Sequence, residues 1–246
     1  MSLNLLCQYG SLKLRTPLIV GACPLTMDRP MRIAMESAGA AAIVLPTLFE
    51  EQIVSANTRT LTAQGNRRFL HNSNSPHFNP SFHDAQHCLT TLRAANEDTS
   101  VPIIAILGGQ NSGDWLNFAA RLAEAGASAI ELNVYPPAEE EFASPEEREN
   151  ELVEIASRIS QAISIPLFVK LDRHHTSISH LARRLLSGVD GVTLFAKFPV
   201  TDIRLDRPEV ELRWDLTAPD SITDLLGPVM EVHANCPSLA LCMRRN

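Results

Sequence analysis

Lys170 is the residue of this 246-residue chain whose position most strongly suggests chemistry. It ends the apolar run Leu167-Phe-Val-Lys. A buried ammonium at such a place is costly unless an anionic or electron-rich partner meets it. The residue type allows three functions: stabilising charge on a reduced cofactor, forming a Schiff base with a carbonyl substrate, or contacting a phosphate. The structural alternative is an ion pair with a carboxylate of a neighbouring strand, such as Glu131.

Other polar side chains follow other apolar runs. Asn133 ends one of them, and its amide could position a planar substrate or only satisfy loop backbone. His174 and His175 follow Lys170 closely, so one of the two could serve as a site acid or base. The histidines of His83-Asp-Ala-Gln-His87 have the spacing of a zinc-binding helix. That motif's glutamate is absent and no third ligand is evident, so we predict no metal site.

A repeated pattern indicates which elements position these side chains. A helical stretch ends at a glycine, and a short apolar run follows within two or three residues. A glycine there can take the left-handed conformation that ends a helix. The runs are apolar on both faces, which is typical of strands in a covered parallel sheet. The three copies of the pattern are Glu36–Leu45, Ala123–Leu132 and Leu185–Leu194, with Gly39, Gly126 and Gly188.

The rest of the chain extends this series. Strands are predicted at Leu18–Cys23, Ala42–Thr47, Ile103–Leu107, Ala129–Val134, Leu167–Leu171 and Gly191–Ala196. Helices are predicted at Pro30–Ser37, His83–Asn96, Asp114–Glu124, Pro145–Ser164 and Ile178–Leu186. Because no Gly-x-Gly-x-x-Gly follows the first strand, we favour a barrel over an open dinucleotide-binding sheet.

The predicted fold class is therefore α/β, a TIM-type (β/α)8 barrel forming a single domain over residues 1–246. Ala218–Leu226 is a candidate short helix and Ser238–Cys242 a candidate seventh strand. No room remains for an eighth strand, so we expect the last β/α unit to be missing. An open barrel seam of this kind would expose apolar surface, which makes a homodimer possible.

Composition restricts the partners. The net charge of −7 argues against nucleic-acid binding, and no apolar run approaches the roughly 20 residues of a membrane helix. The five cysteines are odd in number and form no Cys-x-x-Cys pair, which is typical of reduced thiols. We expect a cytoplasmic protein with a small-molecule substrate, and no nucleic-acid or membrane partner.

Four motifs in order resemble the dihydroorotate dehydrogenase family. They are Pro17–Leu25, Ala38–Leu45, Ala129–Val134 and Ile165–Lys170, and the likeness runs over about residues 3–206. Members of this family are FMN-dependent (β/α)8 barrels that oxidise dihydroorotate to orotate in pyrimidine biosynthesis. The resemblance therefore implies an FMN cofactor and an oxidoreductase activity.

The resemblance also implies roles for individual residues. Ala22 and Cys23 would line the flavin edge, and Thr47 would lie near the isoalloxazine. Asn133 would lie between flavin and substrate, and Lys170 would face the N1–C2=O edge of FMN. A fixed cation there would stabilise the negative charge of the reduced flavin.

The substrate side departs from the family pattern. Asn72 and Asn74 fall in the loop where the family binds its substrate. Pro136 occupies the place of the family's catalytic Cys or Ser base. The adjacent Tyr135 is the remaining proton donor or acceptor, although an ordinary tyrosine pKa of about 10 makes it a poor base at pH 7. The asparagine expected after the sixth strand is Ala196.

Three hypotheses follow. The first is an FMN-dependent oxidoreductase of dihydroorotate dehydrogenase type, oxidising dihydroorotate or a related planar CH–CH substrate with hydride transfer to FMN. The second is a non-catalytic or substrate-divergent homologue of such a flavin barrel, lacking the family's base. The third is a lyase or aldolase barrel in which Lys170 forms a Schiff base.

Overall fold

The core of the computed structural model is a parallel sheet whose strands follow one another in chain order. The structure describes residues 4–49, 85–109, 115–134, 143–173, 175–195, 200–204, 206, 209–213 and 222–243. Within them the sheet has seven strands, in the order β11-β8-β7-β6-β5-β4-β3, and every pair is parallel. The strands are β3 (Ile19–Val20), β4 (Ala42–Phe49), β5 (Ile103–Gly109), β6 (Ala129–Val134), β7 (Leu167–Leu171), β8 (Gly191–Leu194) and β11 (Ala240–Met243).

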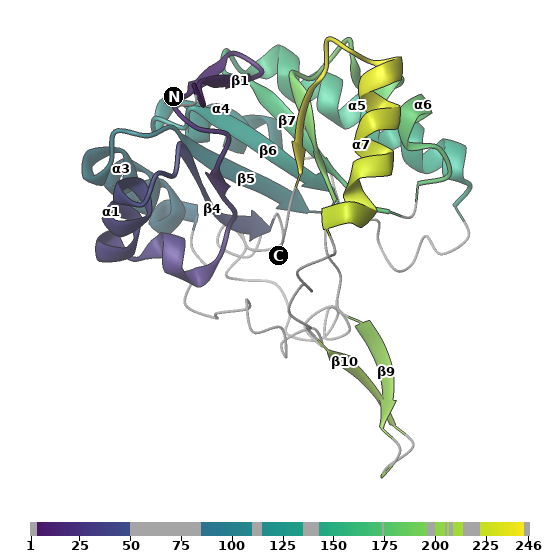
Figure 1. Cartoon of the computed structure of the whole chain (residues 1–246), viewed down its shortest axis with the longest axis horizontal. Coiled ribbons are helices and arrows are strands. Elements are labelled where there is room, and N and C mark those ends of the chain that lie inside the picture. The colour runs from purple at the N-terminus through teal and green to yellow at the C-terminus, as the bar shows by residue number, and fades with distance from the viewer. Residues whose placement is uncertain are drawn as a thin grey trace.

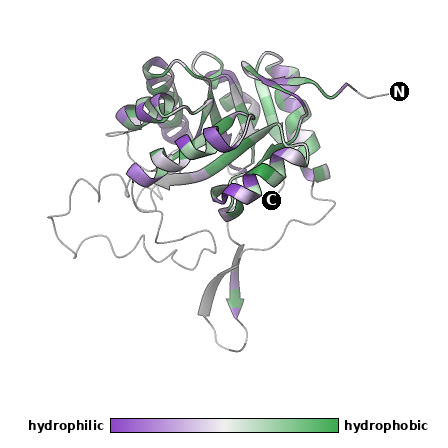
Figure 2. Cartoon of the chain, turned by 90° about the vertical axis from the view of Figure 1, so that its left-hand side faces the viewer, coloured by the Kyte–Doolittle hydropathy of each residue, from purple (hydrophilic) through white to green (hydrophobic). Residues whose placement is uncertain are grey.

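Helices alternate with these strands and cover the outer face of the sheet (Figure 1). The described helices are η1 (Pro24–Met27, a 3-10 turn), α1 (Arg29–Ser37), α3 (Ala85–Asp98), α4 (Trp115–Glu124), α5 (Pro145–Ala162), α6 (Ile178–Leu185) and α7 (Thr223–Asn235). The helix α5 begins at a capping box, in which Ser144 and Glu147 exchange side-chain and backbone hydrogen bonds. Figure 2 shows apolar strands lying beneath helices whose outward faces carry hydrophilic residues.

Among the residues that the structure describes, the inner face of the sheet is buried without any helix covering it. Ile104, Ala129 and Phe168 are each at most 2% exposed, and the apolar cluster they form contains no residue of the α-helices. A sheet with helices on one face can bury its other face by curling. The curled parallel sheet with its outer helices confirms an α/β fold of TIM type, while the missing eighth β/α unit stays a prediction.

Two hairpins were not predicted from the sequence. The strands β1 (Cys7–Tyr9) and β2 (Leu12–Leu14) pair antiparallel through a turn at Gly10, whose φ is 57°. The ring of Tyr9 stacks on Phe168 with 3.8 Å between centroids, so this hairpin closes part of the inner face. The second hairpin, β9 (Val200–Arg204) with β10 (Glu209–Arg213), extends away from the sheet in Figure 1. The three-residue strands of the first hairpin show too little alternation for a sequence pattern to reveal them.

Most predicted element boundaries are confirmed within two residues. The seventh strand is observed as β11, but the last helix is α7 at Thr223–Asn235 rather than Ala218–Leu226. The prediction for Gly39 and Gly126 is also confirmed, with φ of 106° and 100°. Gly188 has no positive φ; a Cβ on it would lie 3.3 Å from the Cα of Ser157, so close packing against α5 favours the glycine. No described helix has the length and hydropathy needed to cross a membrane, and the cytoplasmic location stays a prediction.

Candidate active site

Strand alternation gathers polar side chains on the inner face of the sheet. On β7, Leu167, Val169 and Leu171 pack toward the helices, whereas Phe168 and Lys170 alternate with them and take the opposite face. The strand β6 alternates in the same way, which puts Glu131 and Asn133 on the inner face with Lys170. The register of β7 with β8 sets Lys170 directly beside Thr193.

Lys170 is paired with Glu131. Its Nζ lies 3.4 Å from Glu131 Oε1, and the two side chains are only 3% and 9% exposed. A buried charge of either sign is tolerated when a partner neutralises it, which explains how a lysine fits inside an apolar strand. The structure thus contains the ion pair that the sequence left as an alternative for this lysine.

Two hydroxyl groups extend this pair. Thr193 Oγ1 donates a hydrogen bond to Glu131 Oε2 at 2.8 Å, and Tyr9 Oη lies 3.1 Å from Thr193 Oγ1. Because the single hydroxyl proton of Thr193 is used for Glu131, Tyr9 must donate to Thr193. We refer to Tyr9, Glu131, Lys170 and Thr193 as the Lys170 cluster.

Electrostatics keep the phenol of Tyr9 and the neighbouring thiol of Cys242 protonated. Burial raises the pKa of Tyr9 well above its usual value, and the negative charge of Glu131 adds to the effect. Burial and Glu131 together also raise the pKa of the Cys242 thiol to about 12. Cys242 lies beside Thr193 in the sheet register. Tyr9 therefore remains a hydrogen-bond donor and Cys242 a neutral thiol at neutral pH.

The other predicted site residues are only partly brought to this cluster. Asn133 is 3% exposed and lies on the same face as Glu131, two residues further along β6. Ala22 packs against the inner apolar cluster, and the half-buried Cys23 follows it after β3. Thr47 lies in β4, but its side chain is outside the described part of the chain. Asn72, Asn74, Tyr135 and His174 lie wholly outside the described part.

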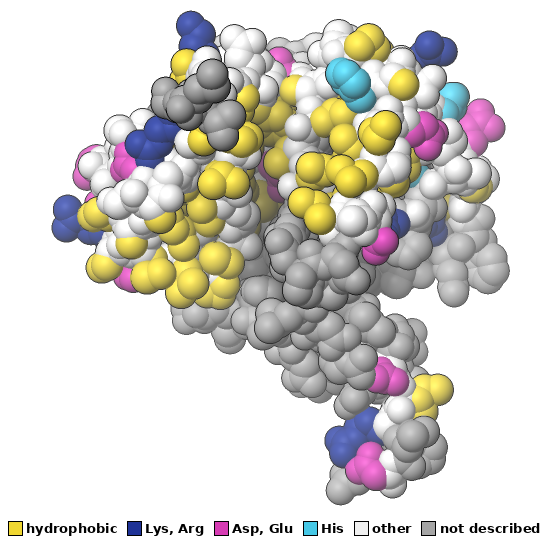
Figure 3. Space-filling model, viewed as in Figure 1, with side chains coloured by type: hydrophobic (Ala, Val, Ile, Leu, Met, Phe, Trp, Pro, Cys, Tyr) yellow, Lys and Arg dark blue, Asp and Glu magenta, His cyan; other side chains and the backbone are white. Residues whose placement is uncertain are grey.

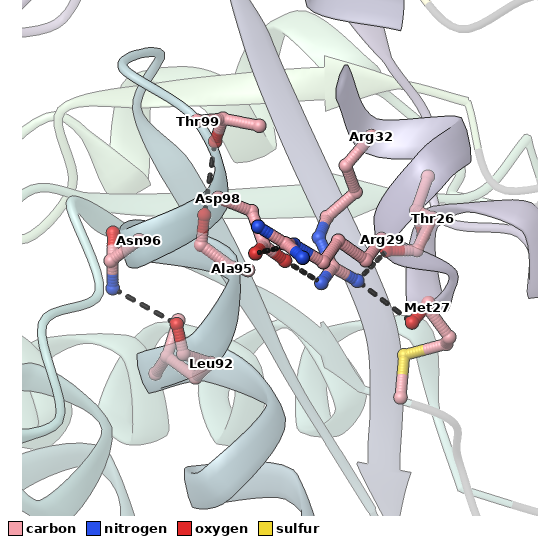
Figure 4. Close-up of polar contacts among 9 residues, drawn as sticks. All are labelled: Thr26, Met27, Arg29, Arg32, Leu92, Ala95, Asn96, Asp98 and Thr99. Carbon is pink, nitrogen blue, oxygen red and sulfur yellow. Dashed lines mark hydrogen bonds and ion pairs between the residues drawn. The ribbon is translucent and has the colours of Figure 1, made fainter. Parts of the chain in front are cut away.

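A buried arginine holds the turn that follows β3. Arg32 donates to the backbone carbonyls of Thr26 and Met27 at 3.1 and 2.7 Å, and its guanidinium also pairs with Asp98 at the end of α3 (Figure 4). Arg29 pairs with the same carboxylate at 2.7 Å but is largely exposed. The hydrogen bond from Arg32 is the main cause that lowers the pKa of Asp98. This clamp fixes η1, and therefore the chain after Cys23, against α3.

Histidine and metal chemistry receive less support. His175 Nε2 lies 3.9 Å from Asp172 Oδ2 in the segment after β7, and His174 lies outside the described residues. Among the residues that the structure describes, no group of three or more His, Cys, Asp or Glu side chains has the arrangement of a metal site.

Sequence reasoning missed two of the four members of the Lys170 cluster. Thr193 and Tyr9 had no signal of their own, because a threonine in a strand and a tyrosine near the N-terminus are ordinary. Glu131 was named only as a possible ion-pair partner. A carboxylate inside Ala129-Ile-Glu-Leu-Asn-Val134, on the same strand face as Asn133, was the available signal.

Comparison with known proteins gives two different likenesses. No protein-family model matches the sequence. A protein of Aeropyrum pernix named dihydroorotate dehydrogenase A (fumarate) is 30% identical over 120 residues, which is 47% of this chain and 37% of that protein. The matching stretch thus spans little more than a third of this curated relative's length.

Solved structures match over far more of the chain. A dihydrodipicolinate synthase from Bacillus anthracis matches with a TM-score of 0.51 and 14% identity, over 92% of this chain and 62% of that chain. A prophage protein of the same family from Escherichia coli K12, solved in complex with pyruvate, matches with a TM-score of 0.51 and 14% identity, over 91% and 62%. At these identities the likeness shows the fold.

These findings correct the identification made from the sequence. The structures that match over nine tenths of the chain belong to the dihydrodipicolinate synthase family, so the predicted FMN-dependent dihydroorotate dehydrogenase is contradicted. The same finding overturns FMN as the cofactor and pyrimidine biosynthesis as the setting. The motifs misled because an apolar strand, a helix-ending glycine and a strand-ending lysine serve any (β/α) barrel and specify no cofactor. In addition, the Glu131 carboxylate beside Lys170 would repel the negative charge of a reduced flavin.

Proposed function

We propose that this protein is a Schiff-base lyase or aldolase, in which the amine of Lys170 condenses with the keto group of pyruvate or another small 2-keto acid. One observation carries the proposal: Lys170 is buried on the inner face of the curled sheet and held next to a carboxylate. The pyruvate bound in a structural neighbour of the same fold suggests the substrate class.

The surroundings of Lys170 suit this chemistry. Desolvation favours the neutral amine, which is the nucleophile, while Glu131 holds the ammonium until a substrate arrives. An iminium carries the same single positive charge as the ammonium it replaces. Glu131 would therefore be a matched counterion both before and after condensation, and neither state leaves a buried charge unpaired.

A second residue of the inner face would orient the substrate. Asn133 is buried two residues beyond Glu131, toward the carboxyl end of β6, where ligands bind in barrels of this type. Its side-chain amide can donate to the carboxylate of a 2-keto acid. We keep Tyr135, which follows shortly after, as a proposed proton donor on sequence grounds alone.

Borohydride trapping tests the proposal. The chain contains only three lysines, Lys13, Lys170 and Lys197, so each possible adduct has its own peptide. We expect pyruvate with borohydride to add one reduced pyruvyl group to Lys170. The exposed Lys13 is an internal control for non-specific labelling. Lys170→Arg keeps the cation beside Glu131 but has no amine that condenses, so it should remain unlabelled. No adduct on Lys170, or equal labelling of Lys13, would reject the proposal.

The second candidate is a non-catalytic barrel in which the Lys170–Glu131 pair is structural. The 3% exposure of the Lys170 side chain favours it. A structural pair can be replaced by apolar residues of similar size at little cost, whereas removing one partner is destabilising. This candidate therefore predicts no trapping, and a Lys170→Met/Glu131→Leu variant about as stable as the wild type.

We also propose that the protein is a single domain that forms a homodimer. Figure 3 shows apolar side chains gathered over η1 and α1 and again over α7. The exposed residues there include Leu25 and Ile33 on the first side, and Leu226 and Met230 on the second. Apolar surface of this kind is common at interfaces between protein copies.

A further inference from the structure

We propose that Glu131 is the proton carrier of this site: it takes protons from the Lys170 ammonium and delivers them to the carbonyl oxygen of the substrate. Thr193 and Tyr9 are then positioning residues that hold Glu131 in place. The inference rests on the proposed Schiff-base function, and it assigns the proton transfers of that reaction.

The two carboxylate oxygens of Glu131 have different partners. Oε1 lies 3.4 Å from Lys170 Nζ, and Oε2 accepts the hydrogen bond from Thr193 at 2.8 Å. Tyr9 donates to Thr193 and so fixes the rotation of the threonine hydroxyl. With Oε2 occupied by a donor, Oε1 is the oxygen that can exchange a proton with the lysine. A fixed geometry of this kind is what general acid–base catalysis requires.

Within the described part of the chain, no other titratable group packed around Lys170 and Glu131 competes for the role of proton carrier. The groups that face Lys170 and Glu131 from neighbouring elements are Tyr9 of β1, Thr193 of β8 and Cys242 of β11. The phenol and the thiol both hold their protons more tightly than usual because of burial and the charge of Glu131. Asp172, two residues beyond Lys170, lies 3.9 Å from His175.

The proton balance closes without an external acid or base. The ammonium carries three protons, and the iminium nitrogen retains one of them. The other two leave with the carbonyl oxygen as water, while the C=N bond replaces the C=O bond. Glu131 carries each of the two protons from Nζ to that oxygen and is a carboxylate again at the end. The nitrogen is a neutral amine while Glu131 holds a proton, but it is positively charged in both the ammonium and the iminium, so the ion pair is present before and after condensation.

The first experiment measures the lysine proton directly. Lysines labelled with 13C at Cε give three NMR signals in this chain, and Lys170→Arg assigns the one of interest. We expect Glu131→Gln to lower the pKa of Lys170 by at least about 1 pH unit, because the amide no longer offsets desolvation. Glu149→Gln is the matched control, since Glu149 is also a buried carboxylate but pairs with His180 and Arg184 in the helical layer. It should leave the Lys170 titration unchanged. An unchanged titration in Glu131→Gln overturns the inference.

The second experiment measures trapping of pyruvate at neutral pH. Glu131→Gln has more free amine than the wild type, yet we expect its rate of adduct formation to fall by about 100-fold, as for loss of a general acid–base. A more nucleophilic lysine that condenses more slowly is a result that a merely structural role for Glu131 does not produce. Thr193→Val should slow trapping and Thr193→Ser should restore it. Glu131→Asp keeps the negative charge, so it should form the pyruvate adduct faster than Glu131→Gln. It also tests the role of the carboxylate if the glutamine variant does not fold.

The outcomes separate the two proposals. A wild type that forms no adduct overturns the Schiff-base function, and the proton transfers to substrate fall with it. A wild type that forms the adduct and a folded Glu131→Gln that forms it equally fast overturns only the role of Glu131. Thr193→Ser behaving like Thr193→Val rejects the positioning role of the hydroxyl.

Discussion

Replacing Asp98 with alanine should destabilise the protein strongly through the arginine that loses its partner. Arg32 is 3% exposed and Asp98 9% exposed, so the variant leaves a buried guanidinium without its counterion. Breaking a buried pair in this way costs about 3–5 kcal/mol, and we expect about 3 kcal/mol because Arg32 keeps its bonds to two backbone carbonyls. Arg29, 72% exposed, joins the same carboxylate, and Arg29→Ala should cost less than about 1 kcal/mol.

Urea unfolding of the wild type, Asp98→Ala and Arg29→Ala measures how much each substitution lowers the free energy of unfolding. The pKa of Asp98 is lowered in the folded state, so its carboxylate contributes stability above the unfolded-state value of about 3.9 and loses it as the pH falls through the folded-state value. The stability gap between the wild type and Asp98→Asn should therefore narrow as the pH falls below about 4. Equal costs for Asp98→Ala and Arg29→Ala, or a gap that does not change in acid, would show that the buried pair is not what holds η1 to α3.

Three further predictions concern packing and association. Gly126→Ala should lower the free energy of unfolding by more than Gly39→Ala does. Both glycines have a positive φ, but only the new Cβ at position 126 would meet a side chain, at 2.8 Å from Asn96 Nδ2. Thermal unfolding of the two variants checks this order. Phe168→Ala should lower the free energy of unfolding in urea by about 3–5 kcal/mol, because the fully buried ring also supports the stacked ring of Tyr9 in the N-terminal hairpin. A cost below about 1 kcal/mol would contradict that packing. Met230→Glu should shift the protein toward monomer in sedimentation velocity, with Leu226 beside it on α7 left intact, and a wild type that is already a monomer would reject the proposed homodimer.

The secondary structure was largely predictable because its signals are local. The start of α5 follows from Ser144, Pro145 and Glu147, whose capping interactions involve only one helical turn. Strands such as Ala129–Val134 were recognised because they are apolar between a helix-ending glycine and a polar end. The α7 boundary was missed because Pro228 lies inside that helix, where a proline is normally a sign of its end.

The candidate site was predictable only in part. Lys170 stood out because a charge at the end of an apolar strand needs an explanation, and Asn133 for a similar reason. Glu131 could be named as a possible partner because it is a carboxylate inside a predicted strand, but the hydroxyl groups of Thr193 and Tyr9 could not be recognised from the sequence. The motifs that suggested a flavin enzyme describe how a (β/α) barrel is built, and that requirement is shared by barrels with different chemistry.

The sequence by itself determined the alternation of strands and helices, the parallel sheet and the presence of a costly buried cation. These properties depend on periodicity and on single residues, which interact with their near neighbours. The tertiary structure decided what the cation meets: Glu131 and Thr193 are 62 positions apart, and Tyr9 and Thr193 are 184 apart. Strand register and the curl of the sheet bring them together, and neither property is written in any local stretch of the chain. The Lys170 cluster, and with it the chemistry we propose, exists only because the inner face is closed.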